Sequence, residues 1–554
     1  MPRQESAGTG GQGQHELGGF PAFSDSSRKN LRLELRSHLR PHPSLVALLT
    51  GSPSQYPEML VGSVIPSPQS PHTERCCTGD IIGAMRPFDP RLFAAILAAG
   101  SARLASRTLK TGGGSTVPGV VARRVDPKVL TKLSRRLRLG SAAITGTNGK
   151  TTTTRMVSGI LRSAGIGGVN NSTGANLVTG VTAALVADSG LSGAPSSEMG
   201  PFEVDEASVP RVAAEAEIRI LAVLNLFRDQ LDRYGELAYT GKVIASAFED
   251  LPRDGAVVLN ADDPLVASLG RSAGRPVFYG VDEPTLDTGR LQHIADSKDC
   301  PVCGTALDYE TVYMGHVGVY DCPRRDFSRP DPDYHASRVR LEGARGSDFL
   351  LSTPKGETEV KVTLPGLYNV YNALAAATVA GEAGAGLPEI SRGLGEFGGA
   401  FGRVERVKAG EREAFLLLIK NPVGFNEILR TFVTSADAKN VLIAINDNDA
   451  DGRDVSWLWD VDFEMLADAR AEGKTDAAPF TVSGIRAQDM AVRLKYADLP
   501  VGLVIPDRKE AIETALQVTP PGETLYVLPT YTAMLEIRKT LSEMGYTHPF
   551  WEDR

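Results

Sequence analysis

The sequence has few cysteines, no long hydrophobic run and no excess of positive charge. Its five cysteines are Cys76, Cys77, Cys300, Cys303 and Cys322, and this odd, clustered set argues against a disulfide framework. We therefore expect a cytoplasmic protein. No apolar run reaches the ~18–20 residues of a membrane-spanning helix. The net charge of −8 argues against a protein that binds nucleic acid through a broad basic surface.

The most apolar stretch near the N-terminus is LFAAILAAG (92–100), which is flanked by arginines. A signal-peptide core or a helix at a membrane surface has a similar composition. The length and position of the stretch favour a third interpretation, an amphipathic helix packed on the domain that follows.

The 554 residues, of which 42% are hydrophobic, correspond to three or four domains at about 100–200 residues each. Residues 1–84 are rich in Gly, Ser, Pro, Gln and His without a sustained period, which predicts a disordered extension. A more ordinary sequence begins at Met85, so the expected translation start is either Met1 or Met85.

From Ser141 onward, short apolar strands (SAAITG, EIRILAVLN, GAVVLNADD, PVFYG) alternate with helical patterns. This alternation predicts an α/β domain with a parallel sheet. We place it at 85–398, interrupted by a cysteine-containing insert at 296–330. Strand patterns in FLLLIK, VLIAIN, PFTVSG, VGLVIP and TLYVLP predict a second, doubly wound α/β domain at 399–554.

The strongest local motif is ITGTNGKTTTT (144–154), in which a strand pattern runs into a glycine turn and then a helix. Such a loop binds phosphates through its backbone N–H groups, a lysine and a hydroxyl that ligates Mg²⁺. The common pattern has glycine five positions before Gly149, where this chain has Ile144, so the loop is a shortened variant. The predicted phosphate-binding residues are Gly146, Thr147, Asn148, Gly149, Lys150, Thr151 and Thr152.

Further polar stretches follow in the order NSTGANL, FEVDEAS, LNLFRDQLDRYGE and VLNADDP. Taken singly, each is also typical of a solvated turn. Glu203 and Glu206 of FEVDEAS are the kind of carboxylate that Mg²⁺ requires.

Together and in this order, these stretches resemble the ATP-binding central domain of the Mur ligases, a family that includes folylpolyglutamate synthase. The resemblance implies ATP and Mg²⁺, with Lys150 and Thr151 at the phosphates and Glu203 or Glu206 at the metal. It also implies nucleotide contacts from Asn260, Asp263 and Arg403, and it matches Asn369 and Asn372 of GLYNVYN to the family's G-x-x-N-x-x-N segment.

The chain departs from the Mur ligase pattern beside the expected γ-phosphate. Gln230 stands where most Mur ligases have histidine, and Lys242 is the only candidate for their carbamylated lysine. We therefore expect a different metal arrangement there.

The insert contains CPVCG (300–304) and Cys322, which is typical of a zinc ribbon. A second Cys-x-x-Cys knuckle is incomplete, because Arg325 occupies the fourth cysteine position. Asp326, His316 or water could complete a site built on Cys300, Cys303 and Cys322. A metal-free loop is the alternative.

The stretch NDNDADGRDVSWLWDVDFE (446–464) holds six aspartates, one glutamate and two tryptophans. It opens like a calcium loop, D-x-D-x-D-G. The position of the required glutamate is Leu458, however, and the preceding VLIAIN is a strand pattern, which argues against calcium. A loop at the end of a buried strand is a common place for function in α/β folds.

DGRDVSW (451–457), FRDQLDR and the cysteine insert resemble the MurT family, the ligase-like subunits of lipid II isoglutaminyl synthase, from about Met85 to the C-terminus. That resemblance implies amidation of the D-glutamate α-carboxylate of lipid II to D-isoglutamine through an acyl phosphate, at the inner face of the membrane, in peptidoglycan synthesis. Ammonia would come from a GatD-like glutaminase subunit, whose Cys and His would form a triad with the catalytic Asp454. Trp457 and Trp459 would contact that partner or pack in the core.

Two alternatives remain. A stand-alone Mur or folylpolyglutamate-type ligase would join an amino acid instead of ammonia, and Lys420 of LLIKNPVGFNEI offers a cation for its carboxylate. The other alternative is a nucleotide-binding scaffold protein without catalytic turnover.

Overall fold

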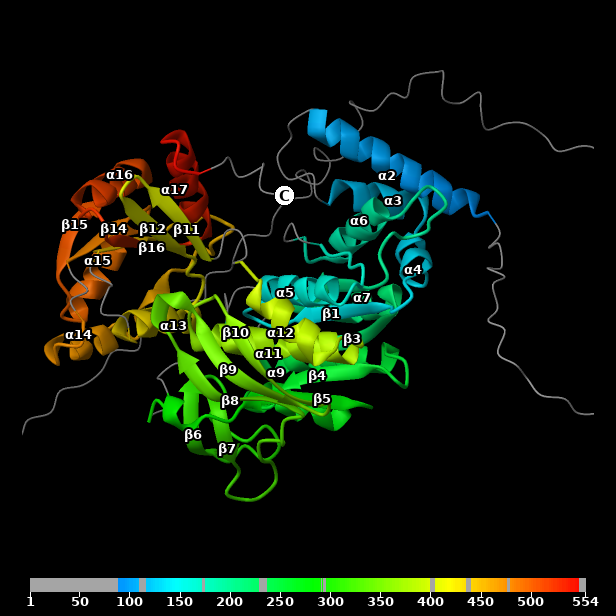
Figure 1. Ribbon diagram of the computed structural model, residues 1–554, viewed down its shortest axis with the longest axis horizontal. Coiled ribbons are helices and arrows are strands. Elements are labelled where there is room, and N and C mark those ends of the chain that lie inside the picture. The colour runs from blue at the N-terminus through cyan, green and yellow to red at the C-terminus, as the bar shows by residue number, and fades with distance from the viewer. Residues whose placement is uncertain are drawn as a thin grey trace, which may run out of the picture. The chain divides into compact units, whose positions relative to one another are not determined.

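The computed structural model describes residues 88–108, 116–171, 175–228, 237–289, 291, 295–398, 404–434, 440–475 and 479–547 (Figure 1). The predicted disordered extension at 1–84 lies outside the described residues, as do Gln230 and Arg403. All described residues belong to one unit of the chain, Arg86–Arg554.

The first domain contains an eight-stranded sheet in the order β10-β9-β8-β5-β4-β3-β1-β2. Every pair from β2 across to β8 is parallel, and β9 is antiparallel to both of its neighbours, β8 and β10. The four predicted strands are confirmed as β1, β3, β4 and β5. The strand bounds are β1 Ser141–Thr145, β2 Gly200–Glu203, β3 Ile218–Val223, β4 Ala256–Asn260, β5 Pro276–Val281, β8 Tyr334–Leu341, β9 Ser347–Thr353 and β10 Gly356–Val362.

Helices cover both faces of this sheet, which explains why its central strands are almost continuously apolar. One core contains residues of α5 (Lys150–Ser163), α11 (Leu367–Glu382) and α12 (Leu387–Gly395). The other core takes residues from α2 Pro90–Thr108, α3 Val117–Val125, α4 Val129–Ser134, α6 Val178–Asp188, α7 Val209–Ala216, α9 Leu237–Ala245 and α10 Pro264–Leu269.

Helix α2 contains the apolar stretch LFAAILAAG and packs against α3 (Figure 1). Leu92, Ala95, Ile96 and Ala99 are buried, which confirms the interpretation as a packed helix. Within the part of the chain that the structure describes, no helix is both long enough and apolar enough to cross a membrane.

The cysteine insert forms a separate hairpin of β6 (Asp308–Met314) and β7 (Val317–Asp321). These two antiparallel strands form a sheet of their own, and Asp321 at the end of β7 also bridges to Ser328.

The second domain contains a six-stranded sheet in the order β11-β12-β16-β13-β14-β15. All five predicted strands are present, as β12 Arg412–Leu417, β13 Asn440–Ala444, β14 Phe480–Ser483, β15 Val501–Ile505 and β16 Thr524–Pro529. The sequence did not predict β11 (Val404–Ala409), an antiparallel edge strand beside β12. The described helices of this domain are α13 Pro422–Thr434, α14 Glu464–Ala471, α15 Ala487–Tyr496, α16 Arg508–Val518 and α17 Tyr531–Glu543.

Candidate active site

The loop between β1 and α5 has a backbone that only glycine adopts easily. Gly146 and Gly149 have φ angles of +129° and +87°, in the region that favours glycine. A Cβ atom at Gly149 would also lie 2.1 Å from Oδ1 of Asn372 in α11. The loop thus packs closely against α11 at the start of α5, where backbone N–H groups can bind an anion.

Replacing Gly149 with alanine is expected to destabilise the fold by about 1–3 kcal/mol, because it adds backbone strain and a collision with Asn372. Nucleotide binding should be lost, since the loop has to move. Gly165→Ala is the matched control: its φ is +71°, but a Cβ there meets nothing within 4 Å. Thermal unfolding and ATP titration of both variants test the prediction, and equal ATP affinities would contradict it.

The lysine and threonine of the loop face two buried glutamates. Nζ of Lys150 lies 2.8 Å from Oε1 of Glu206, and it also donates to the carbonyl oxygen of Gly146. Oγ1 of Thr151 donates to Oε2 of Glu203 at 2.6 Å. Cation, hydroxyl and carboxylates therefore meet at the start of one helix, as Mg²⁺ and phosphate binding require.

The segment that follows β3 supports the phosphate loop from behind. Oδ1 of Asn225 accepts a hydrogen bond from the amide of Asn148 at 2.8 Å, and its Nδ2 donates to the Asn148 carbonyl. Thr147 and Phe227 exchange two further bonds, of 2.9 and 3.0 Å. These contacts fix the path of the loop without using its remaining N–H groups.

A cavity of about 110 Å³ opens beside the loop. Its wall includes Asn148 and Gly149 of the loop, and Lys420 and Asn421 of the second domain. Nδ2 of Asn421 donates to Oδ1 of Asn148 at 2.7 Å, so both domains form this wall. The lining also includes Asn260, which the resemblance assigns to the nucleotide, and Asn369 and Asn372 of the G-x-x-N-x-x-N segment.

Asp263, which is expected to contact the nucleotide, is not among the residues that line the cavity. Its carboxylate is fully buried and caps α10, where it accepts bonds from the amides of Leu265 and Val266. Its other oxygen accepts a 2.9 Å bond from the amide of Leu226. The structure therefore gives Asp263 a supporting position next to the cavity.

Lys242, the candidate for the carbamylated lysine of the Mur ligases, is exposed on α9.

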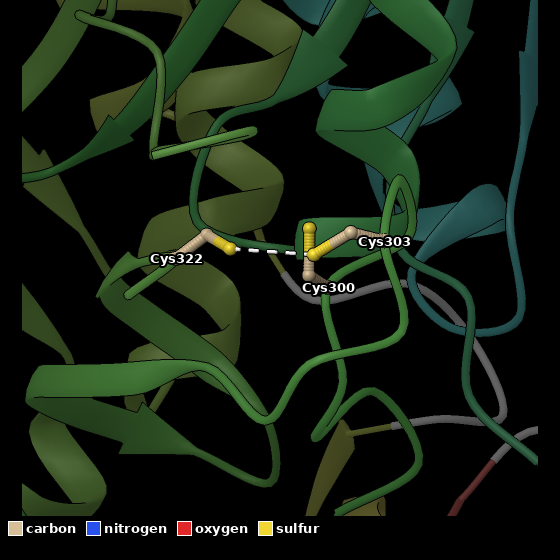
Figure 2. Close-up of side chains that lie close together, drawn as sticks. All are labelled: Cys300, Cys303 and Cys322. Atoms are coloured by element: carbon tan, nitrogen blue, oxygen red, sulfur yellow. Dashed lines mark hydrogen bonds between the residues drawn. The ribbon is translucent and has the colours of Figure 1, made fainter. Parts of the chain in front are cut away.

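The three cysteines of the insert converge, as Figure 2 shows. Their sulfur atoms lie within 4.8 Å of one another, and those of Cys303 and Cys322 are 3.6 Å apart. Burial opposes ionisation of Cys322, but backbone amides of Asp326 and Arg324 donate to its sulfur, so the pKa of this thiol lies below its ordinary value. Converging thiols with N–H donors are compatible with a bound metal ion.

Of the candidates for a fourth ligand, Asp326 is near and His316 is not. The Asp326 side chain lies beside the Cys303 thiol, although it is not one of the three ligands whose atoms lie within 4.8 Å of one another. His316 is fully buried elsewhere, and its ring centre lies 4.6 Å from that of Phe227.

The acidic stretch does not form a calcium site. Asp447 pairs with Arg486, and Asp449 with Arg453. Asp451 accepts bonds from the amide and hydroxyl of Thr532. Among the described residues, the only group of three or more converging His, Cys, Asp or Glu ligands is the cysteine cluster.

Asp454 and Trp459 are exposed in this stretch, whereas Trp457 is not. Oδ1 of Asp454 accepts a 2.8 Å bond from the amide of Ser456, which holds the pKa of this carboxyl below its ordinary value. Trp459 is 53% exposed. Among the described aromatic residues, its only ring contact is an edge-on contact with the exposed Tyr496. Trp457 packs against the core of the second domain beside Phe425.

Comparison with known proteins identifies the family. Residues 144–323 match the Mur ligase middle domain and residues 418–534 match the MurT ligase C-terminal family. The chain is 33% identical over 452 residues to the lipid II isoglutaminyl synthase (glutamine-hydrolyzing) subunit MurT of Staphylococcus aureus strain N315, which covers 82% of this chain and 98% of the relative. The chain belongs to the MurT family. A Streptococcus pneumoniae MurT subunit is 34% identical over 441 residues, which is 78% of this chain and 93% of that protein.

Solved structures share the fold of this MurT-family chain. A pseudomurein peptide ligase type C from Methanothermus fervidus has a TM-score of 0.57 at 23% identity, over 73% of this chain and 78% of that one. MurF from Acinetobacter baumannii has a TM-score of 0.55 at 16% identity, over 77% and 80%. The likeness to these two ligases confirms the predicted α/β architecture.

Two polar residues of the MurT-family site were missed in the sequence. Asn225 holds the phosphate loop, and Asn421 joins the two domains. Asn225 follows a strand directly, in LNLF, and that position was the available signal. Asn421 carries no comparable signal, because its contact with Asn148 spans 273 positions of sequence.

Proposed function

We propose that this chain is the ATP-dependent ligase subunit of a lipid II isoglutaminyl synthase. It would convert the D-glutamate α-carboxylate of lipid II to D-isoglutamine at the inner face of the membrane, for peptidoglycan synthesis. The observation that carries the proposal is the convergence of Lys150, Thr151, Glu203 and Glu206 at the phosphate loop of a MurT-family chain.

The reaction has two steps. An oxygen of the substrate carboxylate attacks the γ-phosphorus of ATP, and the bond to ADP breaks. The nitrogen of ammonia then attacks the acyl carbon of the acyl phosphate, phosphate leaves, and the nitrogen loses a proton to give the amide.

Lys150 would bind the phosphate oxygens on which negative charge gathers, exchanging its present partners, Glu206 and the Gly146 carbonyl, for phosphate. Thr151 and Glu203 would hold Mg²⁺, which supplies charge neutralisation at the phosphates. Asn260, Asn369 and Asn372 of the cavity would contact the nucleoside.

The ammonia source is proposed to be a separate GatD-like glutaminase subunit. Three of the five cysteines form the insert cluster, which leaves only Cys76 and Cys77 for any other chemistry. Asp454 is exposed and ionised, and one of its oxygens is fixed by Ser456. Such a carboxylate is suited to orient a histidine of the partner and to stabilise its cation. The exposed Trp459 would be an anchor for the same partner.

The cysteine cluster is proposed to bind zinc, with Asp326 at the fourth position. We expect about one zinc per purified chain, because three thiolates and a carboxylate complete a tetrahedral site. Elemental analysis after mild chelation is the measurement. Cys322→Ser should lose the metal and Cys77→Ser should keep it. Metal-free, folded wild-type protein would show that Arg325 has destroyed the site.

The proposal is tested by supplying ATP, lipid II and ammonium to the chain with its partner. Amidated lipid II and ADP should form together, and a chain that amidates without ATP would contradict the proposal.

The second candidate is a stand-alone amino-acid ligase, which Lys420 favours because it lines the cavity beside the loop. Such an enzyme would join an amino acid to its substrate with no partner present. Incubation with amino acids in place of ammonium separates the two reactions.

A further inference from the structure

The insert hairpin lies along the turn that follows β4, and alternate residues of the hairpin contact this turn. Nε2 of His316 is 3.4 Å from Oδ2 of Asp263. The amide of Gly318 donates to the Asp262 carbonyl at 2.9 Å. The hydroxyl of Tyr320 donates to the carbonyl of Ala261, adjacent to Asn260, at 3.0 Å.

This turn is also hydrogen-bonded to the segment after β3, and that segment supports the phosphate loop. Nδ2 of Asn260 donates to the Leu224 carbonyl at 3.2 Å, and Asp263 accepts from the amide of Leu226. The adjoining Asn225 fixes the loop through Asn148. A continuous set of hydrogen bonds therefore runs from the hairpin to the phosphate loop.

The hairpin also contributes directly to the cavity wall. Met314, at the end of β6, lines the cavity, as does Phe227. The His316 ring packs on Phe227 from behind, with ring centres 4.6 Å apart.

His316 is unusual because it is fully buried and, within the described part of the chain, neither ring nitrogen makes a hydrogen bond. A buried polar ring without such bonds costs stability, so a packing role alone would be better filled by an apolar side chain. Its place between Phe227 and Asp263 gives it contact with both the cavity wall and the turn.

The far end of the hairpin is joined to the cysteine cluster. Tyr320 and Cys322 belong to one small core with Cys300, Leu307 and Phe327. Cys322 directly follows the last residue of β7. A metal ion held by the three thiols would therefore fix the strand that carries Tyr320.

We propose that the insert hairpin is a positioning element of the nucleotide site, with His316 and Tyr320 as its positioning residues and the cysteine cluster as its anchor. The inference deepens the proposed function and rests on it. On this proposal, the affinity for ATP depends on a hairpin that does not itself touch the phosphates.

The first test compares two tyrosines of the hairpin that differ in where their hydroxyl points. Tyr320 and Tyr313 are 2% and 1% exposed, and each donates a 3.0 Å bond to a carbonyl, of Ala261 and Val281 respectively. Tyr320→Phe should weaken ATP binding by about tenfold, since it frees the turn. Tyr313→Phe should lower the melting temperature to a similar extent and leave ATP affinity unchanged.

The second test uses His316. His316→Leu should raise KM for ATP about tenfold with little change in kcat, measured with ammonium, and His316→Gln should restore part of the loss. A fall in kcat without a change in KM would contradict a positioning role.

The third test removes the anchor. Cys322→Ser, checked for folding by its melting curve, should weaken ATP binding at least as much as Tyr320→Phe. Unchanged ATP affinity in this variant would overturn the anchoring step.

These measurements separate the inference from the function on which it rests. If the wild-type chain binds no ATP, the proposed function fails and the inference fails with it. If the wild-type chain binds ATP and the Tyr320→Phe and Tyr313→Phe variants have equal affinity, only the inference fails.

Discussion

Lys150→Ala is expected to abolish amidation of lipid II with glutamine and with free ammonia alike. Both nitrogen sources attack the same acyl phosphate, and its formation needs the cation that meets the phosphate oxygens. Loss of one such contact lowers kcat by about 10²–10³-fold. The measurement is the rate of lipid II amidation with each nitrogen source in turn.

Loss of Lys150 also leaves the buried Glu206 without its ion-pair partner, which destabilises the fold. A double variant, Lys150→Ala with Glu206→Ala, removes the buried charge and should recover stability without recovering activity. Lys361→Ala, on the exposed surface of β10, is the control for loss of a lysine. Near wild-type amidation with ammonia in the Lys150 variants would show that the phosphate-loop assignment is wrong.

Asp454→Asn is expected to separate the two nitrogen sources. The substitution removes the charge that would stabilise the partner's imidazolium, at a cost of ~10⁴-fold in the glutamine-driven rate, by analogy with serine-protease triads. Free ammonia bypasses glutamine hydrolysis, so amidation at high ammonium concentration should survive. The comparison of both rates in the reconstituted pair is the measurement.

Asp449→Asn is a matched control for Asp454, because Asp449 is an exposed carboxylate of the same loop with an arginine partner. It should leave both rates nearly unchanged. If Asp454→Asn lowers the amidation rates with glutamine and with ammonium equally, the acidic stretch serves folding or the ligase site and not a glutaminase triad.

The sequence predicted those parts of the structure that depend on local pattern. Apolar strand runs between helical patterns gave both sheets, since period and turn residues are visible in a single chain. The glycines of ITGTNGKTT predicted the loop, because positive φ angles favour this residue type. The Cys-x-x-Cys spacing and the later Cys322 likewise predicted a cluster of three cysteines, and their sulfur atoms do converge.

The remaining features depend on contacts between distant segments. A carboxylate that caps a helix, such as Asp263, has the same sequence context as one that binds a ligand, and only burial tells them apart. Trp457 and Trp459 are two positions apart, yet one packs on the core and the other is exposed. The contacts of His316, Gly318 and Tyr320 with the turn after β4 likewise follow from tertiary packing alone.

The central claim is that this chain activates a carboxylate with ATP and passes it to ammonia supplied by a partner. The most direct measurement is mass spectrometry of lipid II after incubation with the chain and its glutaminase partner. We predict amidated lipid II with ATP and glutamine, the same product with ATP and ammonium in the absence of glutamine, and none without ATP. Amidation without ATP, or incorporation of an amino acid in place of ammonia, would contradict the account.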